Sequence, residues 1–388
     1  MSRITIVGGG LAGLTAAIGC AEDGAEVLLL EAHEQLGGRA RSTDGPYKAN
    51  FGPHVIYKGG FVWNWLKERE LLPPIGGLPL GGVRFRWQGA VRRTPPLGTI
   101  PTTLRLRGRE APVDRDFRSW AASLTDERTA AMLSAAAGVY TFHHDPGELS
   151  AAFVWSHTVR VLLSPPPTAR YVIGGWSALV AALEGRARQL GVEIETGHRV
   201  ERLPEGPTIV ATELAQAREL LGDGSLEWPS GDTVCIDLAL EKRRGDPFVV
   251  SDLDEAGWIE RFTAPDPSLA PAGESLVQAQ LPTRPGESTD QAGLRLERLL
   301  DLSLPDWRGR ERWRRRQAMH GRTGALDIPG TSWRDRPAID RGDGVFLAGD
   351  CVAAPGLLSE VAVASGVEAG RLAVGAAGRR RATARTPA

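Results

Sequence analysis

The residues with the clearest chemical meaning lie near the start of the chain. Residues 8–13 read Gly-Gly-Gly-Leu-Ala-Gly and fit the pattern G-x-G-x-x-G. A dinucleotide site needs glycine at these points. Gly8 permits a tight turn, Gly10 lets a pyrophosphate approach the backbone, and Gly13 lets a helix pack closely on a strand. In a chain with 47 glycines the pattern alone is weak evidence, so its surroundings decide what it means.

Those surroundings are typical of a nucleotide site. The pattern predicts a strand, a helix and a second strand at residues 3–7, 11–22 and 27–30. The amides of Leu11 and Ala12 would then face the phosphates from the positive end of the helix. Glu31 follows the second strand, where an acid accepts hydrogen bonds from the adenosine ribose and repels a 2′-phosphate. We therefore predict a dinucleotide-binding βαβ unit.

Two further segments favour a long cofactor. Residues 36–39 read Leu-Gly-Gly-Arg, and an arginine guanidinium binds phosphate through two parallel hydrogen bonds. Near the other end of the chain, Gly349 and Asp350 follow an apolar strand pattern and precede a predicted helix. Asp350 can bind a polyol hydroxyl, and the start of the helix offers free amides and a partial positive charge. A cofactor that contacts both ends of the chain must be long, which favours FAD.

The pattern of elements predicts an α/β protein with two interleaved domains. We expect a Rossmann-like FAD-binding domain, with a parallel sheet and helices, from residues 1–60, 168–215 and 330–388. Residues 61–167 and 216–329 would form an α+β substrate-binding domain. We expect helices at 176–190 and 357–375, strands at 192–194, 200–203, 208–211, 233–240 and 344–348, a helix capped by Asp145, and irregular loops over 246–305.

Composition excludes several classes of protein. The 388 residues include 46 basic and 47 acidic side chains, so no bulk positive charge would attract nucleic acid. No apolar run of about 18 residues predicts a membrane span, which leaves at most peripheral membrane contact. The first residues lack the pattern of a secretory signal. Three widely spaced cysteines predict neither a disulfide framework nor a metal site. We expect a cytoplasmic protein with no metal.

These segments together resemble the FAD-dependent amine oxidase superfamily, which includes flavin amine oxidases, phytoene desaturase-type enzymes and protoporphyrinogen oxidases. The stretch 138–150 is also similar to a segment of the desaturase and protoporphyrinogen oxidase branches. The matching segments are residues 7–13 with Glu31, 36–42, 50–54, 174–175 with the helix that follows, 192–203 and 344–370.

The resemblance implies roles for residues at the matching positions. Gly38 and Arg39 would lie along the pyrophosphate and the flavin. Val200 would pair its backbone with the adenine, and Asp350 would hold the ribityl or phosphate portion. The remaining implied flavin contacts are Gly52, Pro53, His54 and Val55 beside the isoalloxazine ring, and the amides of Leu357 and Leu358 at its pyrimidine side. A helix start at that side would stabilise the reduced flavin anion.

The sequence departs from the family pattern at two points. Amine oxidases usually carry a tyrosine in the C-terminal motif, but residues 355–366 contain no aromatic residue. The C-terminal motif for covalent flavin attachment is also missing, and Cys351 lies outside the expected pattern. We therefore favour non-covalent FAD and the branch nearest phytoene desaturase and protoporphyrinogen oxidase.

Two residues are candidates for catalysis. His54 could act as a base because the resemblance places it near the flavin, although a histidine that only packs against its surroundings is an equal alternative. Tyr140 precedes a predicted helix start in the inserted domain, where a substrate pocket or a solvated loop could lie.

The resulting hypothesis is an FAD-dependent oxidoreductase that dehydrogenates a mainly apolar small molecule by hydride transfer to flavin N5, with oxygen or another acceptor reoxidising the flavin. A flavin amine oxidase acting on a C–N bond is one alternative. A non-catalytic escort of prenylated GTPases is another, and an NADH-binding dehydrogenase would leave Arg39 and Asp350 unexplained. The sequence leaves open the substrate, the acceptor, the oligomeric state, the pathway, and the choice between desaturation, cyclisation, aromatisation and isomerisation.

Overall fold

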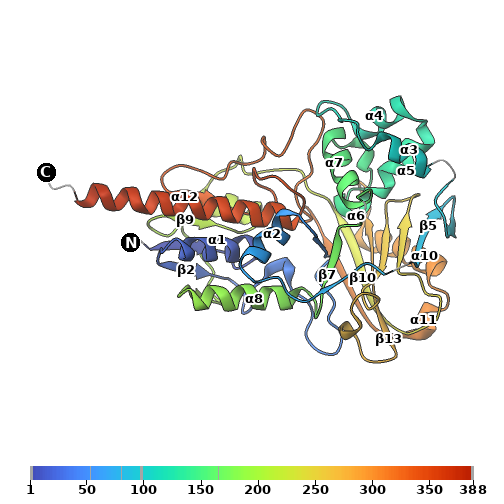
Figure 1. Ribbon diagram of the computed structural model, residues 1–388, viewed down its shortest axis with the longest axis horizontal. Helices are drawn as coiled ribbons and strands as arrows, with labels where there is room; N and C mark the ends of the chain where they lie inside the picture. The colour runs from blue at the N-terminus through green and yellow to red at the C-terminus, as the bar shows by residue number, and fades with distance from the viewer. Residues whose placement is uncertain (1–2, 53, 80, 97–98, 165, 386–388) are drawn as a thin grey trace.

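A five-stranded parallel sheet forms one half of the molecule (Figure 1). The computed structural model describes residues 3–52, 54–79, 81–96, 99–164 and 166–385. The strand order is β15-β9-β1-β2-β8, so strands from the beginning, the middle and the end of the chain lie side by side. Their bounds are β1 Ile4–Val7, β2 Val27–Leu30, β8 Glu193–Glu195, β9 Thr208–Val210 and β15 Val345–Leu347. All four residues of β1 are buried, as expected for a central parallel strand covered on both faces.

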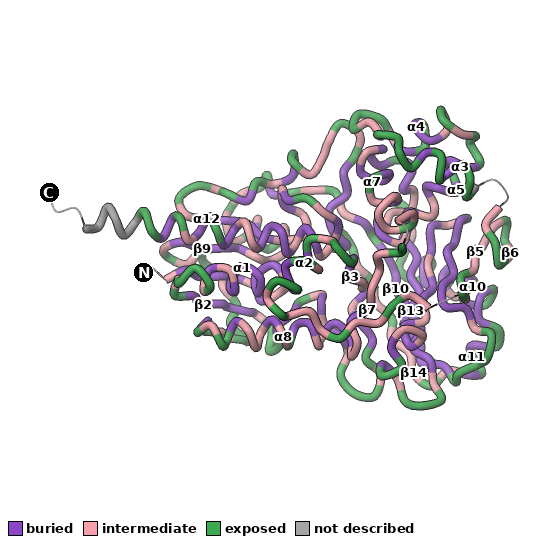
Figure 2. The backbone as a smooth tube through the Cα atoms, viewed as in Figure 1, coloured by how far each residue is buried: buried purple, intermediate pink, exposed green. Residues whose placement is uncertain are grey.

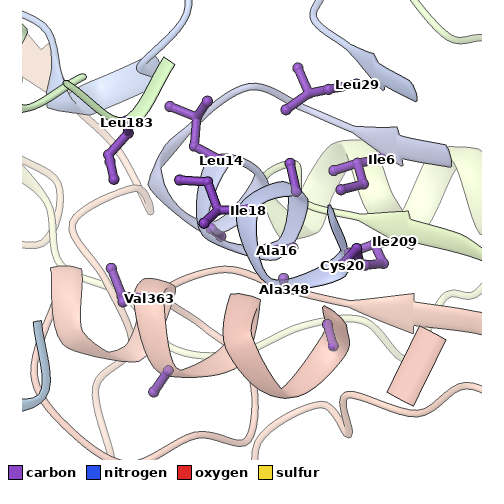
Figure 3. Close-up of a cluster of buried hydrophobic side chains, with 14 of the residues drawn as sticks. Ile6, Leu14, Ala16, Ile18, Cys20, Leu29, Leu183, Ile209, Ala348 and Val363 are labelled. Carbon is purple, nitrogen blue, oxygen red and sulfur yellow. The ribbon is translucent and has the colours of Figure 1, made fainter. Parts of the chain in front are cut away.

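Helices pack on this sheet along its apolar residues. Helix α1 (Leu11–Glu22) contacts both α8 (Trp176–Gln189) and α12 (Ser359–Arg385). Helices α1 and α12 meet through small residues, since a Cβ at Gly366 would come within 2.4 Å of the Ala12 carbonyl oxygen. Figure 3 shows Leu14 and Ile18 of α1 in the same apolar cluster as Leu183 of α8 and Val363 of α12.

A seven-stranded mixed sheet forms the second half, in the order β14-β10-β13-β12-β11-β5-β6. One face packs on helix α10 (Thr289–Ser303) through an apolar core. Successive side chains along each strand point alternately to this face and to the opposite face. The opposite face is turned toward the first half of the molecule. The bounds are β5 Val83–Trp87, β6 Ala90–Arg92, β10 Thr233–Glu241, β11 Val249–Asp252, β12 Trp258–Arg261, β13 Glu274–Pro282 and β14 Glu311–Met319.

A group of short helices lies against one end of this sheet and encloses an aromatic core with Phe117, Trp120 and Trp155 (Figure 1). A small sheet of order β3-β7-β4 joins the two halves. The bounds of these elements are α3 Thr99–Leu106, α4 Phe117–Leu124, α5 Glu127–Ala136, α6 Gly138–Thr141, α7 Ala151–Val161, β3 Ile56–Tyr57, β4 Ile75–Gly76 and β7 Ala169–Val172. The other helices are α2 Phe61–Glu68, α9 Leu214–Leu221 and α11 Trp307–Arg310.

Figure 2 shows buried residues concentrated in the parallel layer and in the strands of the larger sheet. The α/β fold class with a Rossmann-like parallel sheet is confirmed. The strands of the parallel sheet fall within 1–60, 168–215 and 330–388, and those of the mixed sheet fall within 61–167 and 216–329. The domain boundaries themselves stay a prediction. No helix in the described residues is long and apolar enough to cross a membrane.

Three of the predicted elements are wrong. Residues 200–203 form no strand. Residues 246–305 are not irregular, because their proline, aspartate and glycine residues lie in turns between β11, β12, β13 and α10. Helix α10 starts with a capping box formed by Ser288 and Gln291. Asp145 caps only the 3₁₀ turn Pro146–Glu148, and α7 begins separately at Ala151.

Candidate functional site

A cavity of about 1590 Å³ lies between the carboxyl ends of the parallel strands and the face of the mixed sheet that is turned away from α10. Ligands of open α/β sheets bind at the carboxyl ends of the strands, where the glycine-rich loop lies here. The volume exceeds the roughly 300–1,000 Å³ of an ordinary small-molecule site. The cavity can therefore hold more than a substrate alone.

Two glycine-rich loops meet at one end of the cavity. Gly8 has φ +107°, and a Cβ there would lie 2.6 Å from the Ala211 carbonyl oxygen. The Gly37 amide donates to the Gly9 carbonyl oxygen at 2.8 Å, so the loop at 36–39 lies beside the first loop. A Cβ at Gly10 would meet nothing within 4 Å, which leaves open space above the first amides of α1. This arrangement fits the binding of a pyrophosphate.

Glu31 holds the first loop in place. Its Oε2 accepts from the Gly9 amide at 2.7 Å and its Oε1 accepts from the His33 amide at 2.9 Å. Each carboxylate oxygen retains a second lone pair, and Glu31 lines the cavity. The side chain can therefore accept ribose hydroxyls while it orders the loop, as the spacing of the motif predicts.

Arg39 and Asp350 join the two ends of the chain inside the cavity. Arg39 Nη1 donates to Asp350 Oδ2 at 2.7 Å, and Nη2 donates to Oδ1 at 2.8 Å. Arg39 Nη1 also donates to the Arg322 carbonyl oxygen at 2.6 Å. Burial disfavours the charge of Arg39, but the Asp350 carboxylate outweighs this effect and keeps the pKa of Arg39 above its ordinary value. The two residues predicted to contact the cofactor thus also position each other.

His54 lies beside this pair. Its Nε2 lies 2.8 Å from the Arg39 carbonyl oxygen, which can only accept, so Nε2 carries the proton of this bond. The ring lies against Trp176, with centroids 4.6 Å apart. These contacts fix the orientation of His54 at the cavity wall, next to Gly52 and Val55. Pro53 lies outside the described residues.

Tyr140 is buried in the helical group at the far side of the cavity. Its hydroxyl donates to the Val154 carbonyl oxygen at 2.9 Å and lies 2.7 Å from Thr158 Oγ1. Burial raises the pKa of Tyr140 above its ordinary value. Because backbone and threonine already satisfy the hydroxyl, we assign Tyr140 a packing role at the cavity wall.

The segment before α12 contributes one of its two predicted residues to the cavity. Leu358 lines it and has φ +53°, which is uncommon for a side chain of this kind. Leu357 is buried away from the cavity, and its amide donates to Glu360 at 3.4 Å. Glu360 is 2% exposed and pairs with Arg160 of α7. This ion pair ties the helical group to the start of α12.

Most of the residues predicted from sequence line this one cavity, although they come from distant parts of the chain. Gly13 and Leu357 do not line it. Gly13 packs instead against the Gly8 carbonyl oxygen, where a Cβ would lie at 1.8 Å. The lining residues are Gly8, Gly10, Leu11, Ala12, Glu31, Gly38, Arg39, Gly52, His54, Val55, Tyr140, Val200, Gly349, Asp350 and Leu358.

The wall of the cavity opposite the glycine-rich loops is not predicted from the sequence. Trp258 and Glu260 of the mixed sheet and Tyr171 of β7 in the small sheet line the cavity opposite the glycine-rich loops. Glu260 is 4% exposed, and its carboxylate accepts from both Tyr171 and Trp258. The alternation of Trp258, Ile259 and Glu260 is the signal that could have revealed this strand.

Comparisons with known proteins agree with this geometry. A family model described as an NAD(P)-binding Rossmann-like domain matches residues 6–68. A carotenoid 3,4-desaturase from Haloarcula japonica is 52% identical over 52 residues, which are 13% of this chain and 10% of the desaturase. The chain thus matches about a tenth of the length of that curated relative.

Two solved structures match nearly the whole chain. An oxidoreductase from Methanosarcina mazei has a TM-score of 0.77 at 18% identity, over 94% of this chain and 99% of that one. Cyclohexylamine oxidase from Brevibacterium oxydans has a TM-score of 0.71 at 15% identity, over 96% and 98%. The chain therefore has the fold of these two enzymes. The resemblance stated from sequence is confirmed at this level.

The residues of this site fit FAD, the cofactor expected from the sequence. Open space at Gly10, the paired glycine-rich loops and the acid at Glu31 suit the dinucleotide half. The cavity then continues past His54 and Val55 to the sheet wall, which leaves room for a ring system and a substrate. A shorter nicotinamide cofactor would leave the Arg39 and Asp350 region without a ligand function.

Proposed function

We propose that the protein is an FAD-dependent oxidoreductase that binds its flavin non-covalently and dehydrogenates a mainly apolar small molecule. The observation that carries this proposal is the continuous cavity of about 1590 Å³. It joins a dinucleotide cradle to a chamber lined largely by apolar side chains. Bound FAD would supply the two-electron oxidant by accepting a hydride at N5.

The chain's own residues would bind the cofactor, orient it and exclude water. The amides of Leu11 and Ala12 at the start of α1 would bind the pyrophosphate, and Glu31 would fix the ribose. Gly52, His54 and Val55 would position the ring toward the chamber. Its apolar wall would desolvate the reacting carbon, and its members include Leu133, Val139, Val161, Phe248, Val249 and Leu253.

Non-covalent binding is supported by the state of the nearby cysteines. Burial raises the pKa of the Cys351 thiol and of the Cys235 thiol well above the ordinary value. Both therefore stay protonated, and the protonated thiol is a poor nucleophile for attachment to a flavin. Release of FAD by mild denaturation, with no flavin left on the chain, would test this point.

Amine oxidation is the second candidate, because cyclohexylamine oxidase shares the fold. Anaerobic incubation with panels of apolar hydrocarbons or cyclic alkenes and of amines would separate the two reactions. We expect the flavin absorbance to bleach with apolar compounds that lack a nitrogen, and to recover when oxygen or an artificial acceptor is added. Bleaching by amines alone would contradict the dehydrogenation of apolar compounds. A purified chain that binds no flavin would instead favour a non-catalytic binding protein.

A further inference from the structure

Glu260 is the acidic side chain that faces the chamber from the mixed sheet. It lies on β12, an inner strand that pairs with β13 on one side and β11 on the other. In this register Glu260 lies opposite Gln278 of β13 and Val249 of β11. Its Oε1 accepts from the Tyr171 hydroxyl, and its Oε2 accepts from Trp258 Nε1 at 3.1 Å. Glu260, Tyr171 and Trp258 all line the cavity and are joined by these two hydrogen bonds.

Glu260 differs in its partners from three other buried acids, which carry a cationic partner. Glu31 and Asp266 also lack one, but they accept from backbone amides and, at Asp266, from Ser268. Asp237, Asp252 and Glu360 each pair with an arginine, namely Arg315, Arg86 and Arg160. In the part of the chain that the structure describes, no arginine, lysine or histidine forms an ion pair with Glu260. Its two partners are neutral donors, although a buried carboxylate normally requires a compensating charge.

This environment makes Glu260 suited to proton transfer. Burial raises the pKa of Glu260 above its ordinary value, while the hydrogen bonds from Tyr171 and Trp258 oppose this shift. A carboxylate with a raised pKa is a stronger base near neutral pH. Each of its oxygens has one lone pair beyond those that its two partners occupy, and Glu260 lines the cavity.

The surrounding titratable groups do not replace this function. Tyr171 of β7 and Tyr57 of β3 face the same region, and burial raises the pKa of both phenols. Asp237, one strand beyond Gln278, is occupied by Arg315 and two glutamines. Glu260 therefore remains the candidate base on this wall.

We propose that Glu260 is the catalytic base that accepts the proton released when the substrate is dehydrogenated. This proposal rests on the proposed function. One substrate C–H bond would break with its electron pair, and the hydride would pass to the flavin as oxidant. The adjacent C–H bond would lose its proton to a Glu260 oxygen, and its electron pair would form the new double bond. The substrate loses two electrons and two hydrogens, and Glu260 becomes a neutral acid.

The Tyr171 hydroxyl would position the carboxylate for this step. It joins β7 of the small sheet to β12 of the mixed sheet, so it fixes the acid relative to the strand that follows Gly52 to Val55. His54 lies on the flavin side of the cavity, where the bond from its Nε2 to the Arg39 carbonyl oxygen orients the ring. Glu260 lies on the opposite wall, so the proposed proton acceptor is on the substrate side of the cavity.

The variant Glu260→Gln tests the base, since the amide has the same size and can still accept from Trp258 and donate to Tyr171. We expect kcat in the flavin-reduction assay to fall by at least about 100-fold, the range of general base catalysis. The affinity for FAD and the substrate KM should change by less than about threefold. The control Asp252→Asn neutralises a buried acid that lies in the same sheet but does not line the cavity, and it should keep the wild-type rate. A fall of kcat smaller than 100-fold in Glu260→Gln would overturn the proposal.

A second measurement keeps the proposal testable without turnover. Infrared titration of the folded protein should show a carboxyl group that protonates above the ordinary glutamate value of about 4.3, and Glu260→Gln should remove that signal. An unchanged titration in the variant would refute the assignment of Glu260 as the base. Failure of the wild-type protein to bind FAD would instead count against the proposed function, and the infrared result would remain a separate test.

Discussion

Alanine substitutions at Gly13 and Gly10 should separate the packing of the first helix from the binding of the cofactor. At Gly13 a new Cβ would lie 1.8 Å from the Gly8 carbonyl oxygen, so α1 must move by about 1.5 Å before the contact becomes ordinary. We expect Gly13→Ala to lower the free energy of unfolding by about 3 kcal/mol, the upper range of overpacking. At Gly10 a Cβ meets nothing within 4 Å and φ is −73°, so Gly10→Ala should lower it by less than about 1 kcal/mol.

The affinity for FAD should show the reverse order, with the larger loss in Gly10→Ala. In Gly10→Ala the methyl group would occupy the space that the pyrophosphate requires. We expect its Kd for FAD to rise by at least about 100-fold, which is about 2.7 kcal/mol. FAD at about 100 times the wild-type Kd should stabilise the wild-type chain by about 2.7 kcal/mol, and Gly10→Ala by at most about 0.4 kcal/mol.

Equilibrium urea unfolding with and without FAD, together with quenching of flavin fluorescence, gives both quantities. Wild-type affinity for FAD in Gly10→Ala would refute the assignment of the phosphate position. Wild-type stability in Gly13→Ala would refute the packing argument for the third glycine of the motif.

Three further predictions concern contacts at and around the cavity. Asp350→Asn should weaken FAD binding by about tenfold, because it removes the charge that orients Arg39. Fluorescence titration with FAD measures this change, and an unchanged affinity would contradict the role of the pair. Arg160→Leu leaves Glu360 buried without its cation. Urea unfolding should show that the free energy of unfolding falls by about 3 kcal/mol. A fall of less than about 1 kcal/mol would show that the ion pair contributes little to stability. Burial lowers the pKa of His157 from 6.5 to about 3, so its neutral form contributes stability that is present above about pH 6.5 and is lost as the pH falls toward 3. The variant His157→Gln should flatten this part of the curve of stability against pH, and an equally steep curve would exclude His157 as the cause.

The cofactor end of the site could be predicted from sequence because its signals are local. Gly8 permits a tight turn, Gly10 lets the pyrophosphate approach the backbone, and Gly13 lets the helix pack on the strand. Each role depends on residues only a few positions away. Glu31 follows from the same unit, since a strand, a helix and a strand of ordinary length place it beside the loop. The pairing of Arg39 with Asp350 was not predicted, because each was assigned a ligand contact on its own and their side chains meet only after the sheet has formed.

The substrate end could not be predicted for a related reason. Glu260 lies on a strand whose partners, β11 and β13, are recognised only from their register in the sheet. Residues 246–305 contain so many proline, aspartate and glycine residues that their composition predicts loops, although short apolar runs between the turns form the strands. Tyr140 was selected for its place before a helix start, but its hydroxyl faces the next helix, α7, which sequence spacing alone does not show.

Distant parts of this chain are proposed to form one site for a flavin dinucleotide. Its most direct test is the absorbance spectrum of the purified, folded protein, followed by mass measurement of whatever small molecule denaturation releases. We expect a yellow protein that releases one intact FAD per chain, or a colourless protein that takes up one added FAD per chain. A folded protein that neither contains FAD nor binds it when it is supplied would contradict the account.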